Sequence, residues 1–488
     1  MSRAAVELMF ASDIWLEPAV LALLAEARAQ ESQKRRKISK PVPRRGLTDA
    51  TGQARWRIPI PDSVWDELRR PDAETDATWD GQRFRSVYGV PKKIFDELVQ
   101  EARQHGELRG KEALGDGVKG PISKPLELKV AAVLEMCQSG QIFKTAERLY
   151  KISIPALDKF FHAFTRLQVL HEYDKHVYYP QSEEHINSVL TKHSLLGFPG
   201  TITQFDGVKV KWGGCPAADK FANTGKEGYP TRLFNVAGDA TKMVHHVHGS
   251  HPGARNDLTT SYFDEYMQAM KDGLYGSRKF KVYQKGGGQL ELSGFHSLTD
   301  NGYHQWLITQ FPSKASSDIW VQRWSKRAES LRKPGTECIY GILKKRFRIL
   351  ALPISFMDAA QVDNLFRFLV SLHNRLQRYY GLDTLGDHVS DWIMASTDDD
   401  LGRIQAQEAG QSIPHFVNDA AVGNVVHPEF ESAWIARRHA LVAHYQVAWE
   451  KKEILWLKTA AECRPQYLLY PERATDRYEG ELSDGENA

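Results

Sequence analysis

The chain has 488 residues, 42% hydrophobic and 26% charged, an ordinary composition for a globular protein of two or three domains. No apolar run approaches the roughly 18 residues that a membrane span needs, and the N-terminal stretch lacks a convincing small-residue cleavage site. The four cysteines lie far apart, which argues against a disulfide framework and a cysteine-based zinc site. We therefore expect an intracellular protein that is not bound to a membrane. The net charge of +3 is too small to identify a nucleic-acid partner by itself.

A basic segment, residues 28–45, precedes the first predicted domain. Its clusters Lys34–Lys37 and Arg44–Arg45 flank a proline-containing spacer. Such clusters are typical of a nuclear-import signal or of an arm on the DNA backbone, and equally of a solvated tail. Because residues 46–80 look irregular, we interpret 1–80 as a basic, largely disordered arm.

A helical domain is predicted over residues 81–200. Helical periodicity indicates a helix from Val90 and further helices over Leu126–Gln138, Ile142–Tyr150, Ile154–Val169 and Glu183–His193. The short breaks between the middle three, with Ser153 able to cap the last of them, match helix-turn-helix spacing. Any three-helix cluster gives the same spacing, so a structural role stays open. The candidate DNA contacts here are Lys144, Arg148, Lys151 and Lys159.

From residue 201 the periodicity becomes that of strands. Strands are expected over 201–212, 231–238, 242–249 and 294–300, and helices over Asp257–Lys271 and Thr336–Phe347, with irregular sequence before the second helix. Strands surrounded by helices predict an α/β core over 201–380. A helical C-terminal region with an acidic tail is expected over 381–488. The late helices are placed at Asp358–Tyr379 and Ala433–Trp456.

Two aspartates in this core are candidate metal ligands. Asp206 alternates with Ile202, Val208, Val210 and Trp212 along the first strand. A strand that buries this face also buries the acid, which is costly unless the acid is paired or binds metal. The Asp206-Gly207 pair is also a hairpin-turn signal. Asp300 follows an apolar run, where α/β sheets place ligand-binding groups, although it could equally form a turn or cap a helix.

Glu337 is the third candidate ligand. On the helix predicted from Thr336 it shares a face with Gly341, Lys344 and Arg348, opposite the apolar stripe. An acid followed by two cations suits a metal-bound phosphodiester. An exposed acid at a helix N-terminus with a solvated basic face fits the pattern as well.

Asp257 and a group of histidines have simpler interpretations. Asp257 is expected to cap its helix, with a supporting role beside a metal site as the alternative. The histidines lack Cys or acidic partners at a spacing suited to zinc, so we interpret them as strand residues near a substrate groove. A zinc-dependent hydrolase is the rival interpretation. These histidines are His245, His246, His248 and His251.

Several short motifs occur in one order along the chain. They are Gly197-Phe198-Pro199-Gly200, Trp212 with Gly214-Cys215-Pro216, Gly249–Asp257, Leu298-Thr299-Asp300-Asn301-Gly302-Tyr303, the set Glu337, Tyr340, Gly341, Leu343, Arg346 and Phe347, and Leu372-His373-Asn374. In this order they resemble the plant and protist branch of the Harbinger (PIF) superfamily of DDE transposases and their host-derived relatives. The resemblance runs over residues 84–374.

The resemblance implies an RNase H-like core in which Asp206, Asp300 and Glu337 hold two Mg²⁺ (or Mn²⁺) ions. Such a site cuts DNA by in-line phosphodiester displacement and joins strands, and carboxylates suit these hard cations. The resemblance also implies a helix-turn-helix domain and a nuclear protein. DNA is the expected partner, while a separate Myb-like DNA-binding partner and a homo-oligomer stay open. Further cations expected on DNA are Lys209, Lys211, Lys344 and Arg348.

The alternative is a host-adopted, transposase-derived protein that binds DNA or acts as a scaffold without cutting. Because all three acids are present, we prefer the nuclease. The chain departs from the family pattern at Gln204–Gly207 around the first acid. Pro334-Gly335 is also expected to interrupt the helix just before Glu337.

Overall fold

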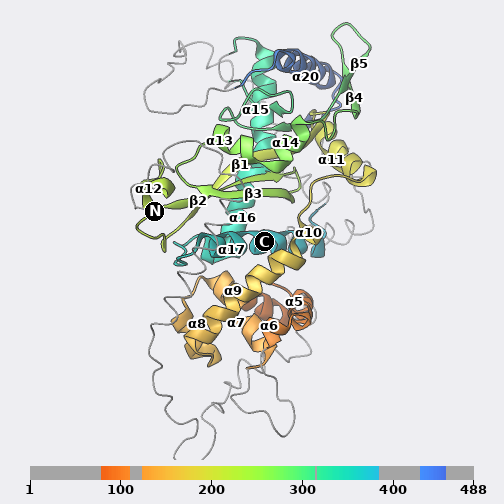
Figure 1. The fold of residues 1–488 in the computed structure, drawn as a ribbon. Coiled ribbons are helices and arrows are strands. Elements are labelled where there is room, and N and C mark those ends of the chain that lie inside the picture. The colour runs from red at the N-terminus through yellow and green to blue at the C-terminus, as the bar shows by residue number, and fades with distance from the viewer. Residues whose placement is uncertain (1–78, 110–123, 314–315, 384–428, 458–488) are drawn as a thin grey trace, which may run out of the picture. The chain divides into compact units, whose positions relative to one another are not determined.

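The computed structural model describes residues 79–109, 124–313, 316–383 and 429–457 (Figure 1). They all belong to one compact unit, Ile60–Ala488. The predicted basic arm and the acidic tail lie outside the described residues, as does most of the region between the last two long helices.

A group of helices precedes the sheet, and the helices predicted in this part of the chain are confirmed within a few residues. They are α4 (Trp79–Tyr88), α5 (Lys92–Gln104), α6 (Gly106–Arg109), α7 (Leu126–Ser139), α8 (Phe143–Tyr150), α9 (Ile154–His171), α10 (Tyr173–His176) and α11 (Glu183–Leu195). Gly140 ends α7 in the left-handed conformation, at φ 71°. Ser153 stands at the N-cap of α9, but its side chain makes no capping hydrogen bond. The Ile154 N–H donates instead to Glu147 Oε1 at 3.2 Å, so the predicted serine cap is wrong in its chemistry.

The core is a five-stranded mixed sheet in the order β3-β2-β1-β6-β7. Its strands are β1 (Thr201–Lys211), β2 (Thr231–Gly238), β3 (Val244–Pro252), β6 (His296–Leu298) and β7 (Thr309–Gln310). The first three pair antiparallel, whereas β6 and β7 run parallel to β1. This sheet, with helices before and after it in the chain, confirms the predicted α/β fold and is consistent with an RNase H-like core. A separate hairpin, β4 (Lys279–Tyr283) with β5 (Gln289–Ser293), was not predicted.

Different helices cover the two faces of the sheet, and they lie on opposite sides of the strands in Figure 1. The helices α16 (Ile339–Arg346) and α17 (Ala359–Tyr379) share one buried cluster with Val208 and Phe234. On the other face, α13 (Asp257–Phe263) and α14 (Glu265–Lys271) lie with α11, where Met267 packs in a cluster with Phe205.

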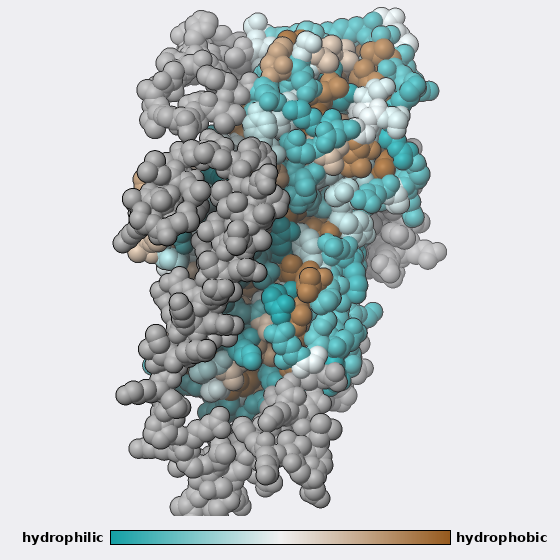
Figure 2. All heavy atoms as spheres, viewed as in Figure 1, coloured by the Kyte–Doolittle hydropathy of each residue, from teal (hydrophilic) through white to brown (hydrophobic). Residues whose placement is uncertain are grey.

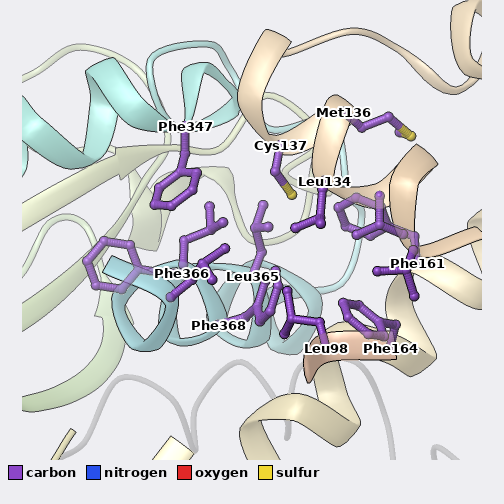
Figure 3. Packing of buried hydrophobic residues seen from close by; sticks show 14 of the residues in the cluster. Leu98, Leu134, Met136, Cys137, Phe161, Phe164, Phe347, Leu365, Phe366 and Phe368 are labelled. Atoms are coloured by element: carbon purple, nitrogen blue, oxygen red, sulfur yellow. The ribbon is translucent and has the colours of Figure 1, made fainter. Parts of the chain in front are cut away.

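The first cluster also includes the helices that precede the sheet. Figure 3 shows Leu365, Phe366 and Phe368 of α17 between Phe347 and the buried side chains of α7 and α9. Since burial of apolar surface is the main stabilising contribution to folding, these helices and the sheet stabilise each other. The domain boundary at residue 200 stays a prediction.

Three details of the predicted core change. The helix expected over 257–271 is two helices, because Asp264 leaves the helical conformation (φ −73°, ψ 108°) and caps α14. Ile202 packs in the cluster of Phe205, away from Val208, and a register shift between Thr201 and Thr203 accompanies this. The stretch predicted to be irregular contains a helix, α15 (Ile319–Lys333).

The predicted interruption at Pro334-Gly335 is wrong. A π-helical turn, η2 (Pro334–Cys338), joins α15 to α16, and Pro334 keeps helical angles (φ −57°, ψ −43°). The wider π turn accommodates a proline that lacks an N–H and crowds the preceding turn of an α-helix. Gly335 lets this turn approach the sheet, since a Cβ there would overlap Gln204 Oε1 and lie 3.0 Å from Asp239 O.

The remaining described elements complete the core. They are α12 (Lys220–Asn223), η3 (Arg348–Leu350), α20 (Ser432–Glu450) and η5 (Leu455–Leu457). α20 packs Leu441 and Tyr445 in a cluster with Trp324 of α15. None of the described helices is long and apolar enough to cross a membrane. Figure 2 shows a described surface that is mostly hydrophilic on this side, with small separate hydrophobic areas.

Gly335→Ala tests the close contact between η2 and the sheet. Gln204 is fully buried and bonded to His193 Nε2 at 2.7 Å, so it has little freedom to move away from a new methyl group. We expect the substitution to lower the free energy of unfolding by about 1–3 kcal/mol, as overpacking does. Urea denaturation followed by circular dichroism measures this.

The matched control is Gly341→Ala, six residues after Gly335 in the helix that continues from η2 into α16. Nothing lies within 4 Å of a Cβ at this position. Alanine there should leave stability unchanged or raise it by up to about 1 kcal/mol. Equal stability of the two variants would contradict the contact.

Candidate active site

Asp206 and Asp300 each follow the last parallel pair of β1 and β6. β1 pairs in parallel with β6 through Thr201–Gln204, and Asp206 comes two residues later. Asp300 comes two residues after the last residue of β6. Parallel strands bring their carboxyl ends together, which is where open α/β sheets place ligand-binding groups. The structure thus places both acids at one edge, and neither is a helix cap.

The Asp206-Gly207 pair is part of β1 and forms no turn. Asp206 pairs with Val236 and Gly207 with Asn235 on β2. The side chain of Asp206 is 18% exposed, and its Oδ1 accepts a hydrogen bond from the Gly207 N–H at 2.9 Å. Burial raises the pKa of Asp206, and the charge of Asp300 adds to the rise. This strand therefore holds an acid where its negative charge is costly, the condition expected of a cation ligand.

Arg332 joins Asp206 to Glu337. Arg332 lies on α15, and its buried guanidinium donates from Nη1 to Asp206 Oδ2 at 2.7 Å and from Nη2 to Glu337 Oε1 at 3.1 Å. Glu337 stands in the π-helical turn and is half exposed, at 51%. Tyr340, one turn further, donates its hydroxyl to Asp206 O at 2.9 Å. The helix that carries Glu337 is therefore bound to β1 by charge and by hydrogen bonding.

Asp257 is a fourth acid at this edge. A Cβ on Gly207 would lie 2.6 Å from Asp257 Oδ1, and one on Gly302 would lie 2.9 Å from Asp300 Oδ1 and 3.1 Å from Asp257 Oδ2. Gly207 and Gly302 thus leave room for the carboxylates of Asp257 and Asp300. Burial, together with the charges of Asp300 and Asp206, raises the pKa of Asp257 to about 7.

The expected capping role of Asp257 belongs to its neighbour. Asn256 is the N-cap of α13, and its side chain accepts a hydrogen bond from the Thr259 N–H at 2.9 Å. Because asparagine is as good a cap as aspartate, the Asn-Asp pair already indicated that the acid was free for another role. The expected capping role of Asp257 is therefore wrong, and the alternative, a supporting role beside a metal site, stays open.

The donor chemistry of the site fits a hard divalent cation. Its side chains offer carboxylate oxygens, the ligands that Mg²⁺ prefers. Arg332 provides positive charge between Asp206 and Glu337. Within the described residues, the acids of this site do not form a group whose ligand atoms all lie within 4.8 Å of one another. His246, His248 and Glu265 form such a group elsewhere. In this arrangement the acids converge on a guanidinium without forming a closed cage.

Two of the four clustered histidines belong to that other group, because the structure gives the four different partners. His245 Nε2 lies 3.2 Å from Asp239 Oδ2, and His251 is bonded to Arg255 at 2.9 Å. His246 and His248 instead meet Glu265 of α14. The argument that no acidic partner lies at a suitable spacing in the sequence therefore fails, because folding brings Glu265 from α14 to two of these histidines.

The predicted DNA-contacting cations fall on separate elements. Lys209 forms an ion pair with Glu227 at 2.9 Å, and the Lys211 ammonium lies 4.2 Å from the ring centre of Tyr229. The other six are exposed on α8, on α9 and its preceding turn, and on α16 and η3, namely Lys144, Arg148, Lys151, Lys159, Lys344 and Arg348. Their contact with DNA stays a prediction.

Comparison with known proteins identifies one family. Residues 175–378 match the model of a family described as plant transposon protein. The matched range contains Asp206, Asp257, Asp300 and Glu337, and it supports a transposase-related family for this part of the chain. No curated protein and no solved structure matches the chain.

The raised pKa of Asp257 gives a testable pH dependence. The folded state binds this proton more tightly than the unfolded state, whose carboxyl titrates near 3.8. Stability is therefore lost as pH rises from about 4 to about 7, by at most about 4 kcal/mol at 1.36 kcal/mol per pKa unit. We expect Asp257→Asn to lose less stability than wild type between pH 5 and pH 8, in about 1 mM EDTA, when urea unfolding is measured.

Asp272→Asn, which changes an exposed acid after α14, serves as the control and should follow wild type. A wild-type profile parallel to that of Asp257→Asn would contradict the crowding of charge at this edge.

Proposed function

We propose that this transposase-related chain is a DDE-type endonuclease that cuts phosphodiester bonds in DNA with bound Mg²⁺ or Mn²⁺. The observation that carries the proposal is the convergence of Asp206, Asp300 and Glu337, from two parallel strands and one helix, on one edge of the sheet. The mixed sheet order and the family match support it. By its resemblance to DDE transposases, the same site would also join strands.

The acids would act as the cation ligands. Bound there, Mg²⁺ would make the attacking oxygen a better nucleophile and stabilise the departing one. Asp206 and Asp300 would hold it from the sheet edge, and Glu337 from the helix. Asp257, whose pKa is raised to about 7, would add negative charge beside them on losing its proton, which would strengthen the attraction for a divalent ion.

Arg332 has two uses in this proposal. Before a cation arrives, its guanidinium neutralises Asp206 and Glu337. When these acids take a metal, the guanidinium is suited to bind a phosphate through two parallel hydrogen bonds. Arg332 would then act on the DNA backbone beside the scissile bond.

DNA would be held by cations outside the acid site. Lys144, Arg148, Lys151 and Lys159 are exposed on the helix-turn-helix-like segment, and Lys344 and Arg348 follow Glu337 along the chain. The basic arm would act as a nuclear-import signal, which assigns the protein to the nucleus. A Myb-like DNA-binding partner and a homo-oligomer remain proposals that rest on the resemblance.

Cleavage of supercoiled plasmid DNA by the purified full chain tests the nuclease. We expect nicking with Mg²⁺ or Mn²⁺ and none with EDTA. Asp206→Asn, Asp300→Asn and Glu337→Gln should each lose at least about 100-fold in rate, since each removes a ligand of the charge-stabilising ion. Circular dichroism would confirm that the variants are folded.

Asp272→Asn is the matched control and should cleave like wild type. Equal cleavage by all variants would show that other residues or a contaminant act. Absence of cleavage by wild type, with any required partner protein supplied and with DNA binding retained, would favour a host-adopted binding protein.

Salt dependence of DNA binding tests the helix-turn-helix-like segment separately. Removing Lys144, Arg148 and Lys159 together by alanine substitution should weaken binding and reduce the slope of log K against log[salt] by about 2–3, at about 0.9 per phosphate contact. Fluorescence anisotropy with a short duplex measures this.

Lys285→Ala, in the exposed turn between β4 and β5, is the control and should leave the slope unchanged. An unchanged slope in the triple variant would place the DNA surface elsewhere.

A further inference from the structure

Two histidines of β3 face the same helix. His246 and His248 are separated by one residue, so both side chains leave the strand on one face. Their rings lie nearly parallel, 15° apart, with centroids separated by 6.5 Å. Both residues belong to a regular stretch of the ladder with β2, in which His246 pairs with Ala237 and His248 with Asn235. The strand therefore fixes their spacing.

Glu265, the first residue of α14, meets both histidines. Its Oε1 lies 3.7 Å from His246 Nε2, and its Oε2 forms a hydrogen bond with His248 Nδ1. The ligand atoms of the three residues all lie within 4.8 Å of one another. These are two imidazoles and a carboxylate directed at one point.

The helix that carries Glu265 is held in place by the residue before it. Asp264 is fully buried, and its Oδ1 accepts hydrogen bonds from the N–H groups of Tyr266 at 3.1 Å and Met267 at 2.9 Å. Its Oδ2 accepts from Asn235 Nδ2 at 2.7 Å. The position of Glu265 opposite β3 is thus set by the fold, as a preorganised ligand requires.

The cluster has unused polar atoms. The Nε2 atoms of His246 and His248 are buried and make no hydrogen bond, although Asp264 Oδ1 lies 3.4 Å from the former. A buried donor or acceptor without a partner is costly, and a metal ion would use one of these nitrogens.

We infer that His246, His248 and Glu265 form a site for a divalent transition metal, Zn²⁺ by preference, separate from the acid site. Imidazole nitrogen with carboxylate oxygen is a ligand set that Zn²⁺ accepts, whereas an all-carboxylate set suits Mg²⁺. Three protein ligands leave the fourth tetrahedral position for water. Glu265 is 60% exposed, so the site has access to solvent.

Occupation of this site would tie α14 to β3. The short helix α13, which begins at Asp257, ends directly before Asp264 and Glu265. The metal would thus hold one end of a segment whose other end carries an acid of the candidate active site. Because it binds the folded state, Zn²⁺ would also stabilise the protein.

Zinc titration of the tag-free full chain, stripped with EDTA, tests the inference. Competition with a chromophoric chelator measures affinity, and Co²⁺ absorption reports the ligand type. We expect one tetrahedral site whose affinity falls at least about 100-fold in Glu265→Gln and in His248→Gln, more than loss of an outer-shell partner costs. Zn²⁺ should raise the Tm of wild type and leave that of Glu265→Gln unchanged.

His439→Gln, which changes an exposed histidine of α20, is the matched control and should bind like wild type. Glu265 is exposed, so its substitution should not disturb folding even if that of buried His246 does. Asp206→Asn should keep its zinc affinity, which separates this inference from the nuclease proposal. Absence of zinc binding in wild type, unchanged affinity in both ligand variants, a thiolate band with Co²⁺, or loss of zinc in Asp206→Asn would each overturn it.

Discussion

The approach of one helical turn to the sheet is the constraint on which the candidate active site depends. A Cβ on Gly238 would overlap the carbonyl oxygen of Gly335, and one on Gly335 would overlap Gln204, so the backbones of β2 and η2 are in contact without side chains between them. The π-helical turn permits this contact despite Pro334. Arg332 and Glu337 flank it, and the Arg332 guanidinium reaches both Asp206 and Glu337.

Electrostatic balance is the second constraint. Burial raises the pKa values of Asp206 and Asp257; the charge of Asp300 raises both further, and that of Asp206 raises the pKa of Asp257. Such a cluster is stable only if protons or cations balance it. In the described structure a proton on Asp257 and the guanidinium of Arg332 are suited to do so. The surrounding fold supplies the hydrophobic burial that holds these groups together, chiefly through the cluster centred on α17.

Much of the fold could be predicted from periodicity, and the misses have physical causes. β2 was placed at its observed bounds because its apolar residues are bounded by turn residues. The helix α15 was missed because charged residues dominate it, although Trp324, Ala328 and Leu331 recur at helical spacing. Pro334 was taken as a break, since local rules describe α-helices and not the π turn that tertiary contact stabilises here.

Prediction of the site likewise depended on whether a residue belongs to a local sequence pattern or is brought in by tertiary contact. Asp206, Asp300 and Glu337 were proposed as metal ligands from their order and settings in the chain, and this assignment stays a prediction. Their partners became clear only on folding, since Asp257 is far from all three in sequence and Arg332, near Glu337 in the chain, bonds to the distant Asp206. The same holds for Glu265 beside the histidines of β3, where spacing along the chain carried no signal.

The bridge made by Arg332 has a consequence for how the acid site would fill. A divalent cation that takes the Asp206 and Glu337 oxygens bonded to Arg332 would displace the guanidinium, so its entry would exchange a singly charged cation for a doubly charged one. The displaced guanidinium would need a new anion, and under the proposed function a DNA phosphate would supply it. Metal and DNA would therefore favour each other's arrival, and the protein alone would resist loading with either.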